Sequence, residues 1–211
     1  MEKLVITIER QAGSGGRQIG DILAKKMGAK CYDEELLKLA AKESGIAEEL
    51  FKAHDEKPTS SFLYSLVMDT YSMGFGTEYS MPINHQIFLA QFEAIKRLAM
   101  DESCVIVGRC ADYALQDLPN MVSVFVCGEE EDKLKRAMEA HGDDAKRAKE
   151  LMIKADKERS SYYNYYSGKK FGEAKSYDLC INTSTLGNDL ELAADIILEF
   201  ARKAIAARNE S

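Results

Sequence analysis

Apolar and polar positions follow two different periods along this chain of 211 residues. Short runs of β-branched and other apolar residues alternate with longer stretches in which apolar residues recur every three or four positions. The short runs predict strands and the longer stretches predict helices. Predicted strands cover residues 4–8, 29–32, 104–107 and 121–126, with a fifth running from 177 into a polar loop at 184, and the longest predicted helices cover 83–100, 143–172 and 186–208. This alternation predicts an α/β fold in three layers: a mainly parallel five-stranded sheet with helices on both faces.

The strand pattern is lost between residues 45 and 82, although the length fits one domain that covers residues 1–211. This loss predicts an inserted helical region or a mobile cover, helical around 61–71. Its segment 59–81 mixes methionine and aromatic residues, which is typical of a small satellite core or a subunit contact, with a base-binding pocket as the alternative. A homodimer is therefore one expectation.

A glycine cluster lies between the first predicted strand and the first predicted helix. Gly13, Gly15 and Gly16 allow the backbone to take positive φ and to approach an anion closely, while the helix start attracts negative charge. This junction predicts a phosphate site. Aligned with the pattern G-x-x-x-x-G-K-[ST], it has Arg10 at the first glycine, Gly16 at the lysine and Arg17 at the serine or threonine. The loop therefore keeps the glycine backbone that surrounds a phosphate, and it lacks the lysine and the serine or threonine of the pattern.

Two charged residues follow predicted strands, at the edge where an open α/β sheet binds its ligands. Arg109 comes after the apolar run 104–107 and Gly108, which predicts a position beside the phosphate loop; pairing with a surface acid is the alternative. Asp112 lies one helical step later and is expected to orient that guanidinium. Asp33 has two interpretations that can both hold: an N-cap that bonds the amides of the next helix, or a carboxylate that faces the ligand crevice.

The charged helix predicted at 143–172 carries four tyrosines within residues 162–166. A solvated helix explains them poorly, because something must cover the rings. A lid that closes over a ligand, or packing on a partner, would cover them. Lys154, Arg159, Lys169 and Lys170 make this segment a basic island in an acidic protein.

Composition narrows the class of partner. A formal net charge of −7 argues against a surface for nucleic-acid polymers, so any anion must be bound locally by a few arginines and backbone amides. No apolar run approaches the roughly 18 residues that span a bilayer, so we expect no membrane contact. The N-terminus enters a strand without a signal pattern, and the five cysteines lack paired spacing; we therefore expect a reducing cytoplasm.

Five segments together resemble a known family. They are I-T-I-E-R-Q-A-G-S-G-G-R-Q-I-G at 6–20, Tyr32-Asp33, V-I-V-G-R-C-A-D-Y at 105–113, D-K-E-R-S-S-Y-Y at 156–163 and Y-D-L-C-I-N-T-S at 177–184. In this order they resemble the cytidylate-kinase-like proteins, a branch of the P-loop nucleoside monophosphate kinases. The resemblance covers nearly the whole chain and is weakest at 50–82. It implies a P-loop NTPase fold with strand order 2-3-1-4-5, an acceptor-binding insertion at 45–82, an arginine-bearing lid at 143–172, and the use of ATP with Mg²⁺.

The family's motifs are matched in part. In authentic cytidylate kinases the loop is G-P-S-G-S-G-K-G-T, and the present A-G-S-G-G-R-Q keeps glycines and Ser14 without the lysine or the threonine. Gly108-Arg109 matches the family's G-R-D, with another residue at the acid. The lid pattern R-D-x-x-D-x-x-R is matched in its second half by Asp156 and Arg159, and the strand-to-loop I-D-T by the segment 181–183.

The resemblance implies ATP-dependent phosphoryl transfer to a small molecule, with a nucleoside monophosphate such as CMP as the expected acceptor. Such transfer needs aligned phosphates and neutralised charge. The implied roles are nucleotide binding by Gly13, Ser14, Gly15, Gly16, Arg17, Gln18, Asn182 and Thr183, catalytic charge neutralisation by Arg17, Arg109 and Arg159, and acceptor binding by Arg10, Asp33, Arg109 and Asp112. The side chain of Arg17 leaves the helix about 100° from the lysine position, so it reaches the phosphates from another side or points to the acceptor. The magnesium ligands stay open among Gln18, Asp33 and water.

Loss of the loop lysine favours one alternative, a nucleotide-binding regulatory module that keeps the kinase fold with little or no transferase activity. Retention of Gly108-Arg109, Asp156 and Arg159 favours the kinase. A Rossmann dinucleotide domain is disfavoured, because the third glycine of G-x-G-x-x-G would fall at position 18, which is Gln.

Overall fold

The protein forms a parallel sheet of five strands covered by helices, as the sequence predicts. The computed structural model describes residues 3–56 and 82–210. The sheet order is β2-β3-β1-β4-β5, which confirms the order 2-3-1-4-5. The strands are β1 (Val5–Arg10), β2 (Lys30–Tyr32), β3 (Cys104–Val107), β4 (Met121–Cys127) and β5 (Leu179–Asn182), all paired in parallel.

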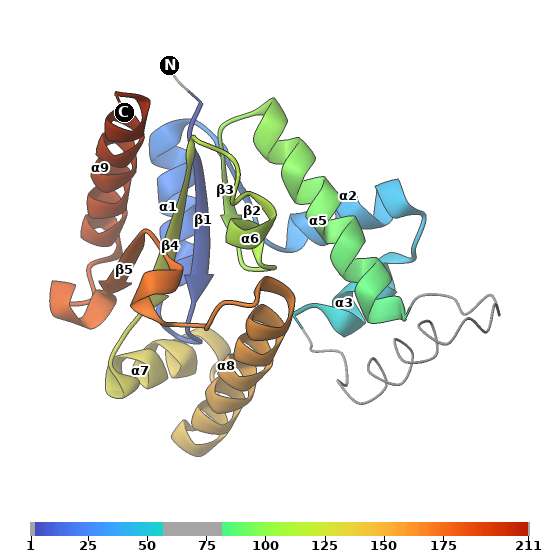
Figure 1. Cartoon of the computed structure of the whole chain (residues 1–211). Helices are drawn as coiled ribbons and strands as arrows, with labels where there is room; N and C mark the ends of the chain where they lie inside the picture. The colour runs from blue at the N-terminus through green and yellow to red at the C-terminus, as the bar shows by residue number, and fades with distance from the viewer. Residues whose placement is uncertain (1–2, 57–81, 211) are drawn as a thin grey trace.

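Helices lie on both faces and beyond the carboxyl ends of the strands (Figure 1). They are α1 (Gly16–Met27), α2 (Glu34–Ser44), α3 (Glu48–His54), α5 (Ile83–Asp101), α6 (Ala111–Ala114), α7 (Glu130–His141), α8 (Ala145–Ser167) and α9 (Leu190–Asn209), with short 3₁₀ helices η1 (Ala174–Ser176) and η2 (Thr183–Leu186). Helices α1 and α9 pack on one face of the sheet, and α2, α5 and α6 on the other. Figure 1 shows α7 and α8 below the point of the β1 arrow, where the predicted ligand edge lies.

Strand β1 is the centre of the sheet and the key to the site. All six of its residues are buried. Side chains alternate between the two faces of a strand, and accordingly Val5 joins the α2–α5 core while Ile6 and Ile8 join the α1–α9 core. Its pairing with β3 ends at Ile8 opposite Val107, but its pairing with β4 continues to Arg10. The end of β1 therefore projects beyond β3 and carries Arg10 on the α1 side.

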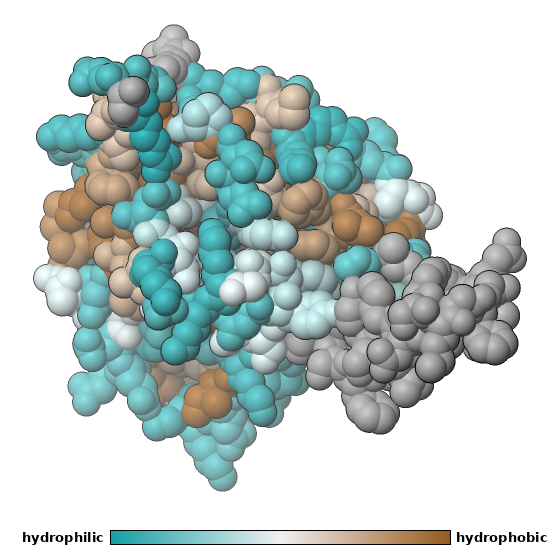
Figure 2. Space-filling model, viewed as in Figure 1, coloured by the Kyte–Doolittle hydropathy of each residue, from teal (hydrophilic) through white to brown (hydrophobic). Residues whose placement is uncertain are grey.

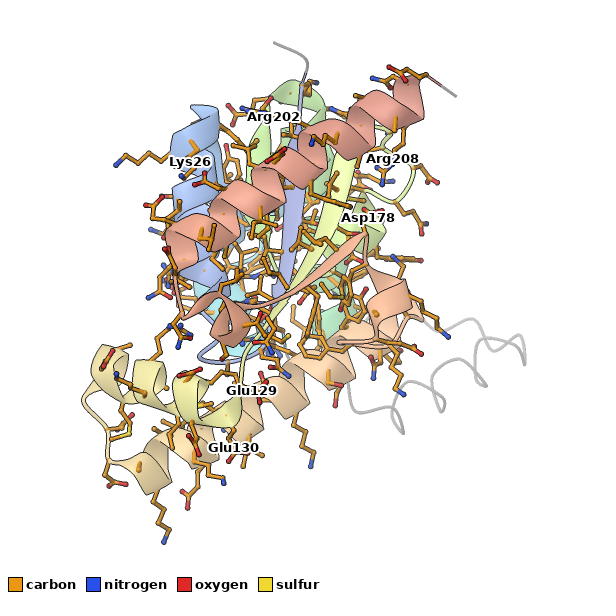
Figure 3. The ribbon with its side chains drawn as sticks, turned by 90° about the vertical axis from the view of Figure 1, so that its left-hand side faces the viewer. Lys26, Glu129, Glu130, Asp178, Arg202 and Arg208 are labelled. Carbon is orange, nitrogen blue, oxygen red and sulfur yellow. The ribbon has the colours of Figure 1, made fainter. Side chains whose placement is uncertain are left out.

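Ion pairs fasten the last helix to the sheet and to α1 (Figure 3). Lys26 of α1 contacts Asp195 of α9 at 2.6 Å, and Arg208 near the end of α9 contacts Asp178, just before β5, at 2.7 Å. Exposed pairs of this kind each contribute roughly 0–1 kcal/mol, so apolar burial carries most of the stability of this layer.

The tyrosines of α8 lie in an aromatic cluster formed by the chain itself. Tyr162, Tyr163 and Tyr166 are buried together with Phe88 and Phe125, and the rings of Phe88 and Tyr166 stack with centroids 3.9 Å apart. The expectation that a ligand or a partner covers these rings is wrong, because side chains of α5 and β4 do so. The cluster fixes the second half of α8, while the first half extends past the strand ends.

The predicted insertion is described only at its two ends. Helix α3 packs Phe51, which has no exposed surface, into the core beside α2. Residues 57–81 lie outside the described residues, and so do the predicted helix at 61–71 and the three interpretations of the aromatic segment. Figure 2 shows a surface that is mainly hydrophilic, with apolar areas over the α9 side of the molecule. Across residues 3–56 and 82–210, no helix is long and apolar enough to cross a membrane.

Candidate functional site

The glycine loop joins β1 to α1 at the carboxyl edge of the sheet. Gly13 and Gly15 have φ angles of +74° and +85°, which strain residues with a Cβ. A Cβ at Gly13 would also collide with the backbone carbonyl of Lys133 in α7. Only glycine fits this close approach, and the cluster that the sequence singles out therefore has a structural cause.

Two of the predicted nucleotide-binding side chains hold the loop from behind. Ser14 donates a hydrogen bond to the carbonyl of Gln11 at 2.8 Å, and Thr183 donates to the carbonyl of Ser14 at 3.1 Å. Ser14 and Thr183 are fully buried. Asn182 accepts from the amide of Ser184 at 3.0 Å at the start of η2. Ser14 and Thr183 hold the loop, Asn182 holds the start of η2, and all three lie outside the lining of the cavity described below.

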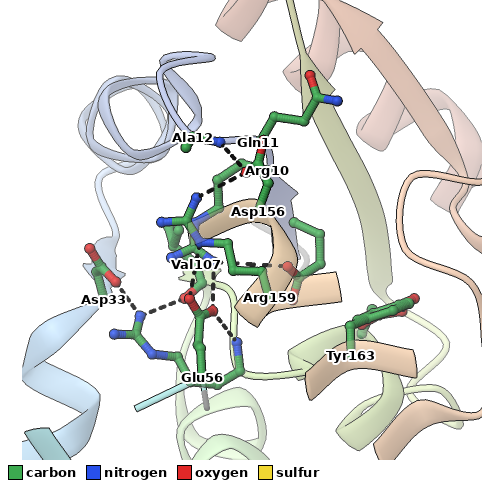
Figure 4. Close-up of polar contacts among 12 residues, drawn as sticks. Arg10, Gln11, Ala12, Asp33, Glu56, Val107, Asp156, Arg159 and Tyr163 are labelled. Carbon is green, nitrogen blue, oxygen red and sulfur yellow. Dashed lines mark hydrogen bonds and ion pairs between the residues drawn. The ribbon is translucent and has the colours of Figure 1, made fainter. Parts of the chain in front are cut away.

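Helices α7 and α8 hold the loop from its open side. Arg136 donates to the carbonyl of Gly13, and Lys133 donates to the side chain of Gln11 at 3.0 Å. Asp156 accepts from the amide of Ala12 at 2.6 Å, as Figure 4 shows. The sequence singles out Asp156 but misses Lys133 and Arg136, because basic residues in a charged helix have no local signal that separates a loop contact from a solvated face.

Three arginines from different elements meet at one carboxylate, that of Glu56 (Figure 4). Arg10 donates to Glu56 Oε1 at 2.6 Å, and Arg159 to Oε2 at 3.3 Å. The backbone amide of Arg109 donates to Oε1 at 3.1 Å. Burial by itself raises the pKa of Glu56, but the guanidinium groups of Arg10, Arg109 and Arg159 outweigh it and hold that pKa well below its ordinary value.

The Arg109 side chain is buried and forms ion pairs inside the site. Its Nε and Nη2 donate to the two oxygens of Asp55 at 3.0 and 2.7 Å, a bidentate contact. Its Nη1 donates to Asp33 and, at 2.8 Å, to the carbonyl of Val107. Arg109 is 3% exposed and lines the same cavity as Gly13, Gly15 and Gly16, so it lies beside the loop as predicted. Its partners are carboxylates of the same cavity and not a surface acid, the alternative that the sequence left open.

The carboxylate of Asp33 faces the ligand crevice, the second of the two interpretations of this residue. Asp33 precedes α2 but makes no side-chain capping hydrogen bond, so the N-cap interpretation is wrong. The carboxylate instead contacts Arg109 and, at 3.2 Å, the Nε of Arg17. Two guanidinium groups attract an ionised carboxylate more strongly than the amides of a helix start. The side chain of Arg17 is 61% exposed and also contacts Glu34 at 3.5 Å, so it points along the rim of the site.

Asp112 lies elsewhere, and the expectation that it orients Arg109 is wrong. Its carboxylate is 1% exposed and accepts from Tyr163 at 2.8 Å and from Lys169 at 3.1 Å. The reason is the backbone between the two residues: Arg109 and Cys110 have φ angles of +55° and +54°, and this left-handed turn sends the chain to another side. Left-handed conformations cost such residues roughly 1–2 kcal/mol each.

The glycine loop and the arginine–carboxylate contacts around Glu56 and Arg109 line one cavity of about 640 Å³. Its charged end is lined by Arg10, Arg17, Asp33, Glu34, Asp55, Glu56, Arg109 and Arg159. The other end lies between α7 and α8 and is mostly apolar, lined by Ala137, Ala140, Ala148, Leu151, Met152 and Ala155, with Arg136 and Asp143 as its charged residues. A cavity of this size and polarity suits a small-molecule ligand with an anionic part and an apolar part. Among the described residues, no group of three histidine, cysteine or carboxylate side chains could hold a metal ion.

Strand order, glycine loop and converging arginines together define a protein of the P-loop kinase fold. Residues 5–185 match the cytidylate kinase-like family, and the chain belongs to that family. No match was found among curated proteins.

Solved structures share this fold. An uncharacterized protein from Eubacterium ventriosum is 32% identical, with a TM-score of 0.71 over 95% of this chain and 99% of that one. Shikimate kinase from Bacteroides thetaiotaomicron is 15% identical, with a TM-score of 0.53 over 94% and 98% of the two chains. The protein TT1252 from Thermus thermophilus is 16% identical, with a TM-score of 0.51 over 94% and 98%. The latter two share the fold with this chain.

Proposed function

We propose that this protein transfers the γ-phosphoryl group of ATP to a small molecule, with a nucleoside monophosphate such as CMP as the acceptor. Membership of a kinase-like family supports phosphoryl transfer in general. The observation that carries the proposal is the convergence of the guanidinium groups of Arg10 and Arg159 on the Glu56 carboxylate beside the glycine loop, with the guanidinium of Arg109 on the carboxylates of Asp33 and Asp55 in the same cavity. Guanidinium groups that surround a carboxylate also suit the oxygens of a phosphate.

The two ends of the cavity suggest how the reactants lie. The free amides at the start of α1 and the backbone of the glycine loop align the phosphates of ATP, and the apolar walls between α7 and α8 accept a base. Arg109 and Asp33 bind the acceptor, and Arg159 approaches from α8. An acceptor oxygen then forms a bond to the γ-phosphorus while the bond to the β–γ bridging oxygen breaks, and ADP leaves with that electron pair. The arginines neutralise the charge on the transferred group.

Magnesium, when bound, would neutralise phosphate charge. Two carboxylates of the cavity, Asp33 and Asp55, form ion pairs with Arg109. They fit a role as one or two ligands of an ion that takes its remaining ligands from phosphates and water, the usual arrangement for magnesium in kinases.

The test is an assay of ADP release with ATP, magnesium and a panel of nucleoside monophosphates and small alcohols. We expect turnover with at least one monophosphate, reduced at least 100-fold by Arg109→Ala, since this substitution removes a guanidinium that touches a reactant. Arg202→Ala on the exposed face of α9 is the matched control and should leave turnover unchanged. Tight ATP binding without ADP release for any acceptor would instead support the regulatory alternative.

A further inference from the structure

The glycine loop offers no side-chain cation of its own to the phosphates. Position 16 is glycine, where the P-loop pattern has the lysine that reaches the β- and γ-phosphates. The next residue, Arg17, does not fill the gap, because its side chain lies along the rim with Asp33 and Glu34. A kinase with this loop needs the missing charge from another element.

The space beside Gly16 is occupied by Arg10. A Cβ placed on Gly16 would lie 2.6 Å from the Cβ of Arg10 and 3.2 Å from its Cγ. Real Cβ atoms do not approach so closely, so a lysine at position 16 and an arginine at position 10 compete for one space. Strand alternation explains the overlap: Arg10 shares the parity of Ile6 and Ile8, whose side chains face α1, and α1 begins at Gly16.

The guanidinium of Arg10 is also placed to contact a ligand. Arg10 is 7% exposed and lines the cavity together with Gly13, Gly15 and Gly16. Glu56 holds Nη1 at 2.6 Å. A guanidinium carries five N–H donors, so one held group still presents a planar edge to phosphate oxygens.

We propose that Arg10 supplies, from the end of β1, the positive charge for the donor polyphosphate that a lysine at position 16 supplies in the ordinary loop. This inference rests on the proposed function. It reassigns Arg10 from binding the phosphoryl acceptor, the role implied by the sequence, to binding the phosphates of the donor. It is consistent with glycine at position 16, where a Cβ would collide with the Cβ and the Cγ of Arg10. It also predicts that Lys is a poor substitute at position 10, because a point charge on a flexible stem loses the bidentate contact.

The first experiment measures binding of ATP, ADP and AMP by calorimetry in the absence of any acceptor. Arg10→Ala should weaken ATP and ADP binding by about 10- to 100-fold, the effect of losing one charge-assisted contact, and AMP binding by less than about threefold. Arg202→Ala serves as the control for loss of an arginine. ATP affinity within about twofold of the wild type in Arg10→Ala would overturn the proposal, and so would a loss confined to the monophosphate.

The second experiment exchanges the two side chains. Gly16→Lys alone should weaken ATP binding, since the new side chain collides with Arg10. Gly16→Lys combined with Arg10→Gly removes the Cβ that the new side chain would meet, and should recover at least about tenfold of the ATP affinity that Arg10→Gly alone loses. A double variant no better than Arg10→Gly contradicts the shared space. Should Arg10→Ala fail to fold by circular dichroism, Arg10→Gln keeps the stem and tests the same charge.

These readouts separate two failures. Unchanged ATP affinity in the Arg10 variants overturns this inference and leaves the kinase proposal standing. Absence of ADP release by a wild-type protein that binds ATP through Arg10 overturns the kinase proposal and leaves the binding role of Arg10 standing.

Discussion

Replacing Glu56 with Gln tests whether the arginine cluster depends on one buried negative charge. Glutamine keeps the shape of the side chain and removes the charge that Arg10 and Arg159 contact at 2.6 and 3.3 Å. The side chain of Glu56 is only 11% exposed, so water compensates poorly. Removing one partner of a buried pair generally costs about 3–5 kcal/mol of unfolding free energy, because the remaining charges stay buried without it.

A second carboxylate reduces this cost. Burial, followed by the charge of Glu56, raises the pKa of Glu9 to about 8, so Glu9 is mostly protonated at pH 7. One of its oxygens lies 3.8 Å from Arg10 Nη1. Without the charge of Glu56 the pKa of Glu9 falls. Glu9 then ionises, and its negative charge near Arg10 replaces part of the charge that the substitution removes. We therefore expect Glu56→Gln to cost about 2–4 kcal/mol at pH 7.

The assay is urea unfolding of the wild type, Glu9→Gln, Glu56→Gln and the double variant. Glu9→Gln alone should leave the free energy of unfolding unchanged or raise it at pH 7, because glutamine resembles the protonated acid and avoids the proton uptake that Glu9 needs on folding. The double variant should be less stable than the sum of the singles by about 1–2 kcal/mol, since Glu9 can no longer ionise. Additivity within about 0.5 kcal/mol, or a loss below about 1 kcal/mol for Glu56→Gln, would refute the reasoning.

Glu56 and Glu9 change the folding stability with pH in opposite directions. The pKa of Glu56 is lowered on folding, so its stabilisation is present above the ordinary value of 4.5 and is lost as the pH falls below it. The pKa of Glu9 is raised, so the folded protein keeps a proton between pH 4.5 and about 8 and loses stability as the pH rises through that range. Glu9→Gln should remove this second slope, at most about 1.4 kcal/mol per pH unit.

Three further predictions test packing around the site. Gly108→Ala should cost more than about 3 kcal/mol in urea unfolding, because its φ is +76° and the new Cβ meets the buried ion pair, whereas Gly28→Ala, with φ of +63° and open space, should cost about 1 kcal/mol. Tyr163→Phe should cost about 1–3 kcal/mol, since it removes a donor from buried Asp112. Asp156→Asn should weaken ATP binding by about tenfold in calorimetry while the free energy of unfolding changes little. The substitution weakens the hydrogen bond that the amide of Ala12, in the glycine loop, donates to Asp156.

The fold was predictable because its signals are local. Strands β3 and β4 are short, mostly apolar runs that are almost wholly buried, and Gly13 and Gly15 of the loop mark positions where the structure has positive φ. The position of Arg109 was also predictable, since it follows a buried strand at the ligand edge of the sheet. The arginine partners were not predictable. Glu56 lies 53 residues before Arg109 in a segment without a motif, and no local pattern indicates which carboxylate a buried arginine binds.

Three predictions made from local sequence alone are wrong, because contacts with distant parts of the chain decide where these side chains lie. Asp33 is an ordinary capping residue by position, but two arginines draw its carboxylate into the site. Spacing of three residues suggested that Asp112 faces Arg109, but the left-handed turn between them separates the two side chains. The tyrosines of α8 suggested a ligand or partner surface, but Phe88 from α5 completes their cluster.

The charges that line the cavity explain how an acidic protein can hold an anion and what binding demands. Five arginines and five carboxylates line it, so the cavity has no formal excess of positive charge. A polyphosphate therefore has to exchange arginine–carboxylate contacts for arginine–phosphate contacts. Arg109 is held by a bidentate partner, whereas Arg10 is held to Glu56 through a single nitrogen. The contact between Arg10 and Glu56 leaves the other N–H groups of Arg10 able to bind phosphate oxygens, and Arg10 lies beside the glycine at the lysine position.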